Sequence, residues 1–442
     1  MTRIVSFLNR RANFIVFVIL FFSVLWSCRF LLSSDCFYSH DLDYNLARGY
    51  EAVQSIKLGN IPLRWSGNIN NGCGAPVFNF FYPLGYYLLA LFYFLLGSIL
   101  LSWKVLIFIC LFLGSWFFYL WAKKITGDPL ASFLGSFIYL FAPYRFLLVF
   151  VRGSLEFLSY AIFPILLFIF SVFLREKNRN KEILYLFFAS LVGALFFLSH
   201  NIVVMLMFPI FLAILFLDLW SFNFPRRKIF LSIFSILTIF GLSSFFIGPA
   251  LVEKKYVKLG HLNIVNYADH FPTLGQIIRS KWGYFFSVPG ENDGMSFMLG
   301  YAQWLVLLIS TLAVFYLFFV RKNSFRVFLR EYFWVIFYFL LSTLFIFLIL
   351  SQSNFVWNNF IILQQIQYPW RLLGVLVFLI SALSSYLFSK LKKGFFYWLF
   401  LFFIFALAIF GNRNHLRVFD SCQGKESLYK DFSNLYVSWV GT

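Results

Sequence analysis

The chain is long, apolar and basic: its 442 residues are 61% hydrophobic and only 12% charged, with 67 phenylalanines and a formal net charge of +19. A mean hydropathy of +0.82 excludes an ordinary soluble enzyme and predicts an all-α polytopic membrane helical bundle. The basic residues lie in short loops between apolar segments rather than on a soluble face. They therefore indicate membrane topology, and we expect no nucleic-acid partner.

Apolar segments of about 20 residues, the length that crosses a bilayer, recur along the chain. We expect no cleavable signal peptide, because the first apolar segment is long and no small-residue cleavage site follows it. The predicted spans, eleven in all, are Phe14–Leu32, Lys104–Trp121, Ala131–Val149, Phe157–Leu174, Ile183–Ser199, Ile202–Trp220, Ile229–Ala250, Met298–Val320, Tyr332–Leu350, Leu372–Ser389 and Phe395–Gly411.

One further apolar stretch, Phe80–Leu101, decides the topology. The residues Arg3, Arg10 and Arg11 place the N-terminus in the cytoplasm. If Phe80–Leu101 does not cross, every later dense basic cluster also falls inside, whereas a crossing would move these clusters outside. We therefore predict an interfacial helix or helix pair at the outer face, an N-terminus inside and a C-terminus outside. The clusters are Lys123–Lys124, Arg175–Lys181, Arg226–Lys228, Arg321–Arg330 and Lys390–Lys393.

This topology makes residues 1–411 one transmembrane module with three longer outer loops, at 33–103, 251–297 and 351–371. The outer tail, 412–442, has only about 30 residues, too few for an independent domain. The inner face receives short basic turns. Because loops on a rigid scaffold usually carry function, we expect the working surface on the outside.

The first outer loop carries two close carboxylates, Asp41 and Asp43, beside His40. Two carboxylates at this spacing can share a divalent cation such as Mg²⁺ or Mn²⁺, or divide the roles of base and metal ligand. Alternatively, one of them caps a helix over Tyr44–Leu58 that ends at Gly59. The two interpretations are compatible, because a capped helix would hold the carboxylate rigidly.

The five cysteines show no metal-ligand spacing. Cys28 and Cys110 lie in apolar segments, and we expect them in the core. Cys36 and Cys73 in the first loop would pair only if that loop faces an oxidising compartment.

An ionisable pair, Arg152 and Glu156, follows the third predicted span and opens the fourth. At membrane depth such a pair is a candidate for function, and a snorkelling arginine with a satisfied partner is the alternative. His200 and Asn201 form a polar break between the fifth and sixth spans. A lone histidine in such a turn has either a structural or a substrate-binding role.

Two later outer segments combine cations with aromatic and amide side chains. Arg279 and Lys281 precede a Gly-rich turn that contains Asp293, a combination suited to gripping a phosphate and a sugar ring. Gln367 and Arg371 stand at the mouth of the tenth span. There, amides and an arginine are costly unless they line a polar cavity.

Several motifs occur together in one order: SHDLDYN, NGCGAPVFNFFYPLGYY, VRGSLEF, LSHN, SKWGY and QYPWRLL. Over most of the chain they resemble the bacterial membrane proteins named 6-pyruvoyl-tetrahydropterin synthase-related. The chain lacks the histidine cluster of the small soluble zinc enzyme from which that name comes. The membrane family is similar in turn to the GT-C glycosyltransferases.

The resemblance implies a multi-pass glycosyltransferase of the bacterial plasma (inner) membrane with an exoplasmic active face. It implies transfer of a sugar from a polyprenyl-phosphate donor to a glycan, lipid or protein acceptor, and direct displacement would invert the anomeric centre. Asp41 matches the first-loop acid of the GT-C enzymes and Glu156 the second-loop acid, whereas relatives often carry a histidine near the position of Asn45.

We therefore predict Asp41 as the catalytic base, with Asp43 and Glu156 assisting it or binding a divalent cation. The predicted substrate-binding residues are His40, Arg152, His200, Arg279, Lys281, Asp293, Gln367 and Arg371.

Two other functions stay open. A lipid-linked sugar transporter or flippase would place ionisable residues near the bilayer midplane and often shows internal repeats. Here the charges gather at the outer ends of the spans, and no half of the chain is duplicated. A non-catalytic membrane protein of envelope assembly would tolerate loss of the outer carboxylates.

Overall fold

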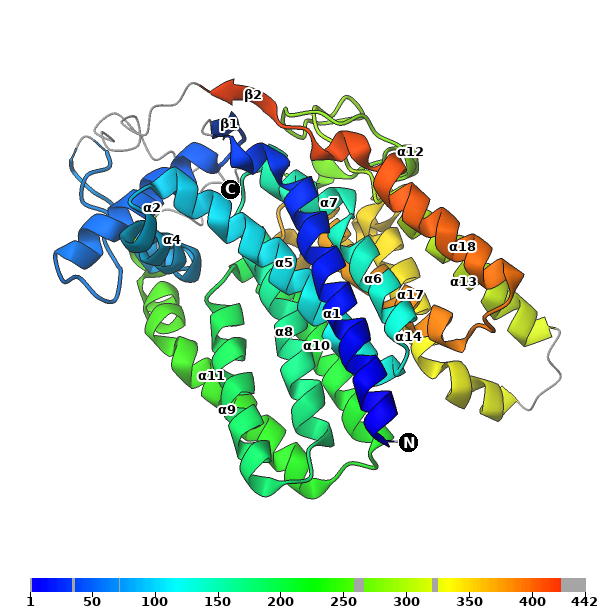
Figure 1. The fold of residues 1–442 in the computed structure, drawn as a ribbon. Helices are drawn as coiled ribbons and strands as arrows, with labels where there is room; N and C mark the ends of the chain where they lie inside the picture. Colours follow the sequence, from blue (N-terminus) through cyan, green and yellow to red (C-terminus); the bar gives the residue numbers. More distant parts are fainter. Residues whose placement is uncertain (1, 34–35, 71, 258–265, 320–324, 423–442) are drawn as a thin grey trace. The chain divides into compact units, whose positions relative to one another are not determined.

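The computed structural model describes residues 2–33, 36–70, 72–257, 266–319 and 325–422, and these are almost entirely helical (Figure 1). Asp35 of the first loop and the tail beyond 422 lie outside the described residues. Two short strands, β1 (Cys36–Tyr38) and β2 (Phe419–Cys422), pair antiparallel with Cys36 opposite Cys422. The prediction of an all-α bundle is confirmed.

Seven helices among the described residues are long and apolar enough to cross a membrane. They are α5 (Ile99–Thr126), α8 (Glu156–Arg175), α9 (Arg179–Phe197), α10 (Asn201–Ser221), α11 (Arg226–Glu253), α14 (Phe325–Ile349) and α17 (Leu373–Lys390). Shorter apolar stretches in three further helices coincide with other predicted spans. They are Arg11–Ser27 of α1 (Thr2–Ser27), Tyr301–Tyr316 of α13 (Tyr301–Phe319) and Phe395–Gly411, which includes α18 (Phe395–Ala406). The chain is thus a polytopic helical membrane protein.

The remaining predicted span is a bent pair. α6 (Pro129–Leu140) is followed at 45° by the segment Pro143–Val151, and the pair makes an eighth crossing if it is one span. The Asp128 side chain caps α6 by accepting hydrogen bonds from the backbone of Leu130 and Ala131. The bend follows from Pro143, which lacks the N–H that would continue α6.

The chain divides into two compact units. Unit 1 comprises Met1–Ser27, Ser115–Leu147 and Val265–Arg417, and unit 2 comprises Cys28–Gly114, Leu148–Ile264 and Val418–Thr442.

Helix α17 is the core of unit 1: every residue from Leu373 to Phe388 is buried, and the helix packs against α6, α13 and α14. Gly135 in α6 permits this close approach, because a Cβ there would lie 2.6 Å from the Ser381 carbonyl oxygen in α17.

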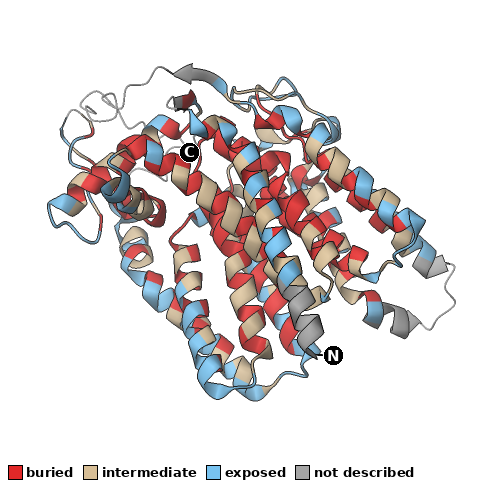
Figure 2. Ribbon diagram, in the orientation of Figure 1, coloured by how far each residue is buried: buried red, intermediate tan, exposed pale blue. Residues whose placement is uncertain are grey.

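In unit 2, α8 packs against α9 and α10, and α9 packs against α11. α11 leaves large apolar side chains exposed, such as Phe230 and Leu237, and its exposed residues are pale blue in Figure 2. An exposed apolar face of this kind is what lipid tails would cover.

The ambiguous stretch Phe80–Leu101 is not one continuous helix. It contains the end of α3 (Val77–Phe80), the helix α4 (Leu84–Leu96) and the start of α5. α4 has 13 residues, and at about 1.5 Å per residue it is shorter than the ~30 Å apolar core of a bilayer. It ends at Gly97, whose φ of 73° is left-handed, and it packs against α2 (Leu42–Lys57). The interfacial position stays a prediction that these lengths favour.

Candidate active site

Three hydrogen bonds in unit 2 join the first predicted outer loop to the segment that precedes α8. The backbone N–H of His40 donates to the Val151 carbonyl at 2.9 Å, and that of Asp41 donates to the Arg152 carbonyl at 2.8 Å. One turn into α2, the Asn45 amide donates to the Gly153 carbonyl at 2.9 Å. Asp41 is thereby held beside Arg152 by backbone geometry as well as by charge.

Arg152 stands between two carboxylates. Its Nη1 donates to Glu156 Oε1 at 2.5 Å, and its Nη2 lies 3.8 Å from Asp41 Oδ2. The side chains of Arg152 and Glu156 are 6% and 1% exposed, and that of Asp41 is 12% exposed. The guanidinium therefore compensates two buried negative charges, and Asp41 is the carboxylate that solvent or a substrate reaches more easily.

The carboxylate of Asp41 does not cap α2. Asp41 occupies the position before the first helical residue, yet its side chain accepts no hydrogen bond from the helix N-terminus. The helix begins at Leu42 rather than near Tyr44, and Gly59 with φ of 78° follows its end. The capping alternative for Asp41 is wrong, because this carboxylate faces Arg152.

Asp43 lies in the first turn of α2 and is exposed. A carboxylate there is favoured by the positive end of the helix dipole. Its position suits stabilisation of the helix, whereas Asp41 is buried and lies 3.8 Å from Arg152 Nη2.

His200 completes the buried cluster from the N-terminus of α10. Its Nε2 lies 4.0 Å from Glu156 Oε1, and its ring lies 4.2 Å from the ring of Tyr82. Burial, and then the neighbouring Tyr86 and Glu156, raise the pKa of Tyr82 well above its usual range. The Tyr82 phenol is consequently neutral near pH 7 and is a hydrogen-bond donor.

Two polar residues near this cluster, Asn45 and Arg48, were not predicted as site residues. Asn45 accepts a hydrogen bond from the Tyr86 hydroxyl at 3.1 Å. Arg48 is 4% exposed, its guanidinium lies 4.1 Å from the centre of the Phe81 ring, and its Nε has no hydrogen-bond partner among the described residues. Asp41, Asn45 and Arg48 follow the i, i+4, i+7 spacing of one helix face, and this spacing is the signal that could have found them.

The other predicted binding residues belong to unit 1. Asp293 organises its own loop there: its Oδ1 accepts from Ser287 Oγ at 2.8 Å and from the Val288 N–H at 3.0 Å, and its Oδ2 accepts from Gln276 at 2.9 Å. These bonds favour a structural role for Asp293.

Gln367 and Arg371 close the turn before α17. Arg371 Nη1 donates to Gln367 Oε1 at 2.8 Å and to the Ile366 carbonyl at 3.0 Å, and the Arg371 side chain is almost fully buried. Gln367 adopts a left-handed φ of 69°. This pair is a structural clamp on the turn, whereas Arg279 and Lys281 line a pocket.

The residues predicted to bind a divalent cation do not form a ligand set. Among the residues that the structure describes, no three His, Cys, Asp or Glu side chains are grouped so that they could hold a metal ion. Glu156 is instead paired with Arg152, and Asp43 is exposed on α2. Cys73 is an exposed free thiol, whereas the side chain of Cys36 lies outside the described part of the chain.

The comparisons with known proteins concern the fold. No protein-family model matches the chain, so the resemblance to the 6-pyruvoyl-tetrahydropterin synthase-related proteins stays a prediction. An uncharacterized protein of Lactococcus lactis subsp. cremoris (strain MG1363) is 23% identical over 291 residues, which cover 63% of this chain and 46% of that protein.

A solved structure is similar over most of the chain. The oligosaccharyltransferase of Archaeoglobus fulgidus, crystallised with Zn and sulfate, matches with a TM-score of 0.50 and 17% identity. The match covers 92% of this chain and 54% of that one, so the chain spans about half the length of each of these two proteins. At this level of identity the likeness shows the fold alone, which is similar to that of the archaeal oligosaccharyltransferase.

Proposed function

We propose that this protein is a membrane-embedded glycosyltransferase. It moves a sugar from a polyprenyl-phosphate donor to a glycan, lipid or protein acceptor at the outer face of a bacterial plasma membrane. The observation that carries the proposal is the buried Asp41–Arg152–Glu156 cluster in unit 2. The similarity of the polytopic fold to an oligosaccharyltransferase supports it.

Asp41 acts as the general base. As its carboxylate takes the proton of an acceptor hydroxyl, the hydroxyl oxygen forms a bond to the anomeric carbon of the donor sugar. The bond between that carbon and the phosphate oxygen breaks, and the electron pair stays on the phosphate. Lipid phosphate leaves as an anion, and the configuration at the anomeric carbon is inverted.

Glu156 and Arg152 are positioning residues in this scheme. Arg152 orients the Asp41 carboxylate, and the buried Glu156 carboxylate holds Arg152 in place. Arg48 is the candidate for the leaving phosphate, because its buried guanidinium has an N–H without a partner among the described residues. A guanidinium recognises phosphate oxygens through charge-assisted hydrogen bonds.

The substitution Asp41→Asn tests the proposal, because it removes the base and preserves the side-chain volume. We expect transfer to fall by about 100-fold or more, the range for loss of a general base, with the protein still folded. The assay uses purified protein in liposomes that contain a polyprenyl-phosphate sugar, radiolabelled in the lipid, together with a membrane glycolipid fraction as acceptor. It measures release of the labelled polyprenyl phosphate. The matched control, Glu291→Gln, changes an exposed carboxylate of unit 1 and should keep full activity.

Full activity of Asp41→Asn would refute the role of Asp41. If wild-type protein moves the donor across the liposome bilayer without breaking its sugar–phosphate bond, the transporter alternative replaces the transferase. If neither activity appears and Asp41→Asn complements a deletion strain as well as wild type does, the non-catalytic alternative is favoured.

A further inference from the structure

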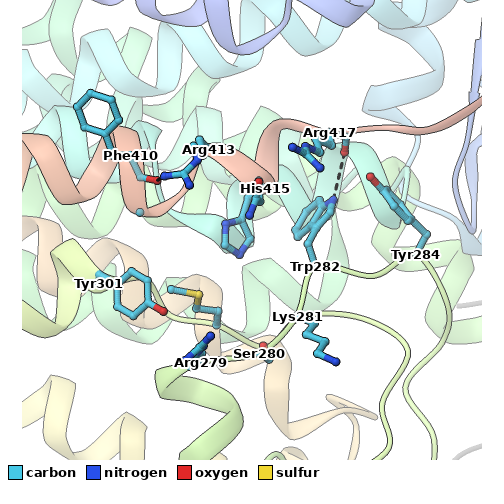
Figure 3. Close-up of a pocket in the computed structure, with 13 residues that line it drawn as sticks. Arg279, Ser280, Lys281, Trp282, Tyr284, Tyr301, Phe410, Arg413, His415 and Arg417 are labelled. Atoms are coloured by element: carbon cyan, nitrogen blue, oxygen red, sulfur yellow. Dashed lines mark hydrogen bonds between the residues drawn. The ribbon is translucent and has the colours of Figure 1, made fainter.

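Unit 1 contains a cavity of about 820 Å³ with a strongly basic lining (Figure 3). Two parts of the chain form most of it: the loop that follows α12 (Leu274–Ile278), and the segment after α18 that includes the short helix η9 (Arg413–Leu416). Tyr301, the first residue of α13, adds to the lining. Its cations are Arg279, Lys281, Arg413 and Arg417, and none of the described residues that line it is acidic. Because no carboxylate balances these charges within the lining, an anion is the natural occupant.

Hydrogen bonds within the protein hold the two parts together. Trp282 Nε1 donates to the Arg417 carbonyl at 3.2 Å, a bond drawn as a dashed line in Figure 3. The Ser280 hydroxyl accepts from the Phe297 N–H at 2.9 Å and anchors the loop. The pocket is therefore formed before any ligand arrives.

Aromatic rings line the same cavity. Trp282, Tyr284, Tyr301 and Phe410 contribute to the walls (Figure 3). The cavity is far larger than a phosphate ion and has the size of a small-molecule site, which is about 300–1,000 Å³. Aromatic faces pack against the apolar C–H face of a sugar ring, so the lining suits a ring that carries an anionic group.

The buried ring of His415, whose nitrogens have no hydrogen-bond partner among the described residues, is a second indication of a ligand. His415 lines the cavity and is 4% exposed. Burial lowers the pKa of His415 to about 4. The ring is neutral at pH 7 and offers one N–H donor and one acceptor. A buried polar group without a partner is costly unless a ligand hydroxyl supplies the missing bonds.

We propose that this pocket binds a sugar that carries a phosphate or a carboxylate. The cations hold the anionic group, the aromatic walls pack on the ring, and His415 hydrogen-bonds a hydroxyl. The proposal stands on the pocket and does not depend on the chemistry of Asp41. If the proposed transferase function is right, two substrates carry this chemistry: the sugar-phosphate end of the donor and an anionic acceptor glycan.

Calorimetric titration of the purified full-length protein in detergent tests the pocket. The probes are glucose 1-phosphate, glucuronate, glucose and inorganic phosphate. We expect the two anionic sugars to bind at least about tenfold more tightly than glucose or phosphate alone, because each charge-assisted bond is worth about a factor of ten. Binding is measured without turnover, so failure here leaves the assignment of Asp41 untouched.

The variants Arg417→Gln and Lys281→Gln should each weaken binding of glucose 1-phosphate by about tenfold. Both side chains are exposed, so the substitutions leave the fold intact. His415→Phe should weaken the binding of both anionic sugars while the midpoint of thermal unfolding stays the same. The matched control is Lys392→Gln, an exposed cation of the same unit outside the pocket, which should bind as wild type does.

A competition arm with farnesyl phosphate distinguishes the two sources of ligand. Displacement of glucose 1-phosphate by the prenyl phosphate indicates the donor end, and unchanged binding indicates an acceptor glycan. The proposal is overturned if neither anionic sugar binds, if inorganic phosphate binds as tightly as they do, or if Arg417→Gln and Lys281→Gln bind as wild type does.

Discussion

The backbone of Gly153 contacts the start of α2 beside the acidic cluster. Replacing Gly153 tests whether this close contact positions the cluster. It follows Arg152, and its carbonyl accepts the Asn45 amide. Its φ of 58° lies in the left-handed region. A Cβ at this position would overlap the Ser39 hydroxyl and lie 3.0 Å from the Leu42 nitrogen in the first turn of α2.

The expected cost of Gly153→Ala has two parts. The left-handed backbone costs a residue with a Cβ about 1–2 kcal/mol, and overpacking against neighbours costs about 1–3 kcal/mol. The Ser39 hydroxyl can rotate away, whereas the Leu42 nitrogen is backbone and moves only together with Asp41. We therefore expect a loss of about 2–5 kcal/mol in the free energy of unfolding.

Gly59→Ala is the matched control, because Gly59 has a φ of 78° in the same unit and a Cβ there would meet no atom within 4 Å. The free energy of unfolding of Gly59→Ala should fall only by the cost of the left-handed backbone, about 1–2 kcal/mol. Denaturant unfolding in detergent measures the stability of both variants, and the liposome assay measures sugar transfer by each. Transfer should fall about 100-fold in Gly153→Ala, the cost of a 1 Å misplacement, and stay near wild type in Gly59→Ala. Equal effects of the two substitutions on stability and transfer would show that the approach of α2 to Gly153 does not shape the site.

Other groups give further tests. Arg152→Gln leaves Glu156 buried without its cation and should lower the free energy of unfolding by about 3–5 kcal/mol. Adding Glu156→Gln should restore part of that stability in denaturant unfolding. If the losses from the two substitutions simply add in the double variant, the pairing is contradicted. The pKa of His415 is lowered from 6.5 to about 4 in the fold, so the unfolded chain binds the proton first. Stability should therefore fall by up to about 3 kcal/mol as the pH drops from 6.5 to 4, and His415→Gln should flatten that slope in unfolding measured across this pH window. Cys73 is exposed and should react with a membrane-impermeant maleimide added to intact cells, as located by mass spectrometry; reaction only after permeabilisation would place the first loop inside.

The helices were predictable because their signal is local. Length and hydropathy of a segment decide whether it crosses a bilayer, and each predicted span coincides with a helix or the bent pair. The pairing of Arg152 with Glu156 was also within reach, since four residues separate them. The first turn of α2 was not, because its start at Leu42 depends on the backbone bonds to Val151 and Arg152.

The sequence by itself determined the membrane class, the succession of helices and the candidate acids. A helix that crosses a bilayer needs about 20 apolar residues, and composition and spacing show such segments directly. Only the tertiary structure decided that Asp41 meets Arg152, 111 residues further along the chain. It also placed Trp282 against Arg417, 135 residues along the chain, to close the basic pocket. Such contacts arise from the packing of distant segments, which local propensity does not encode.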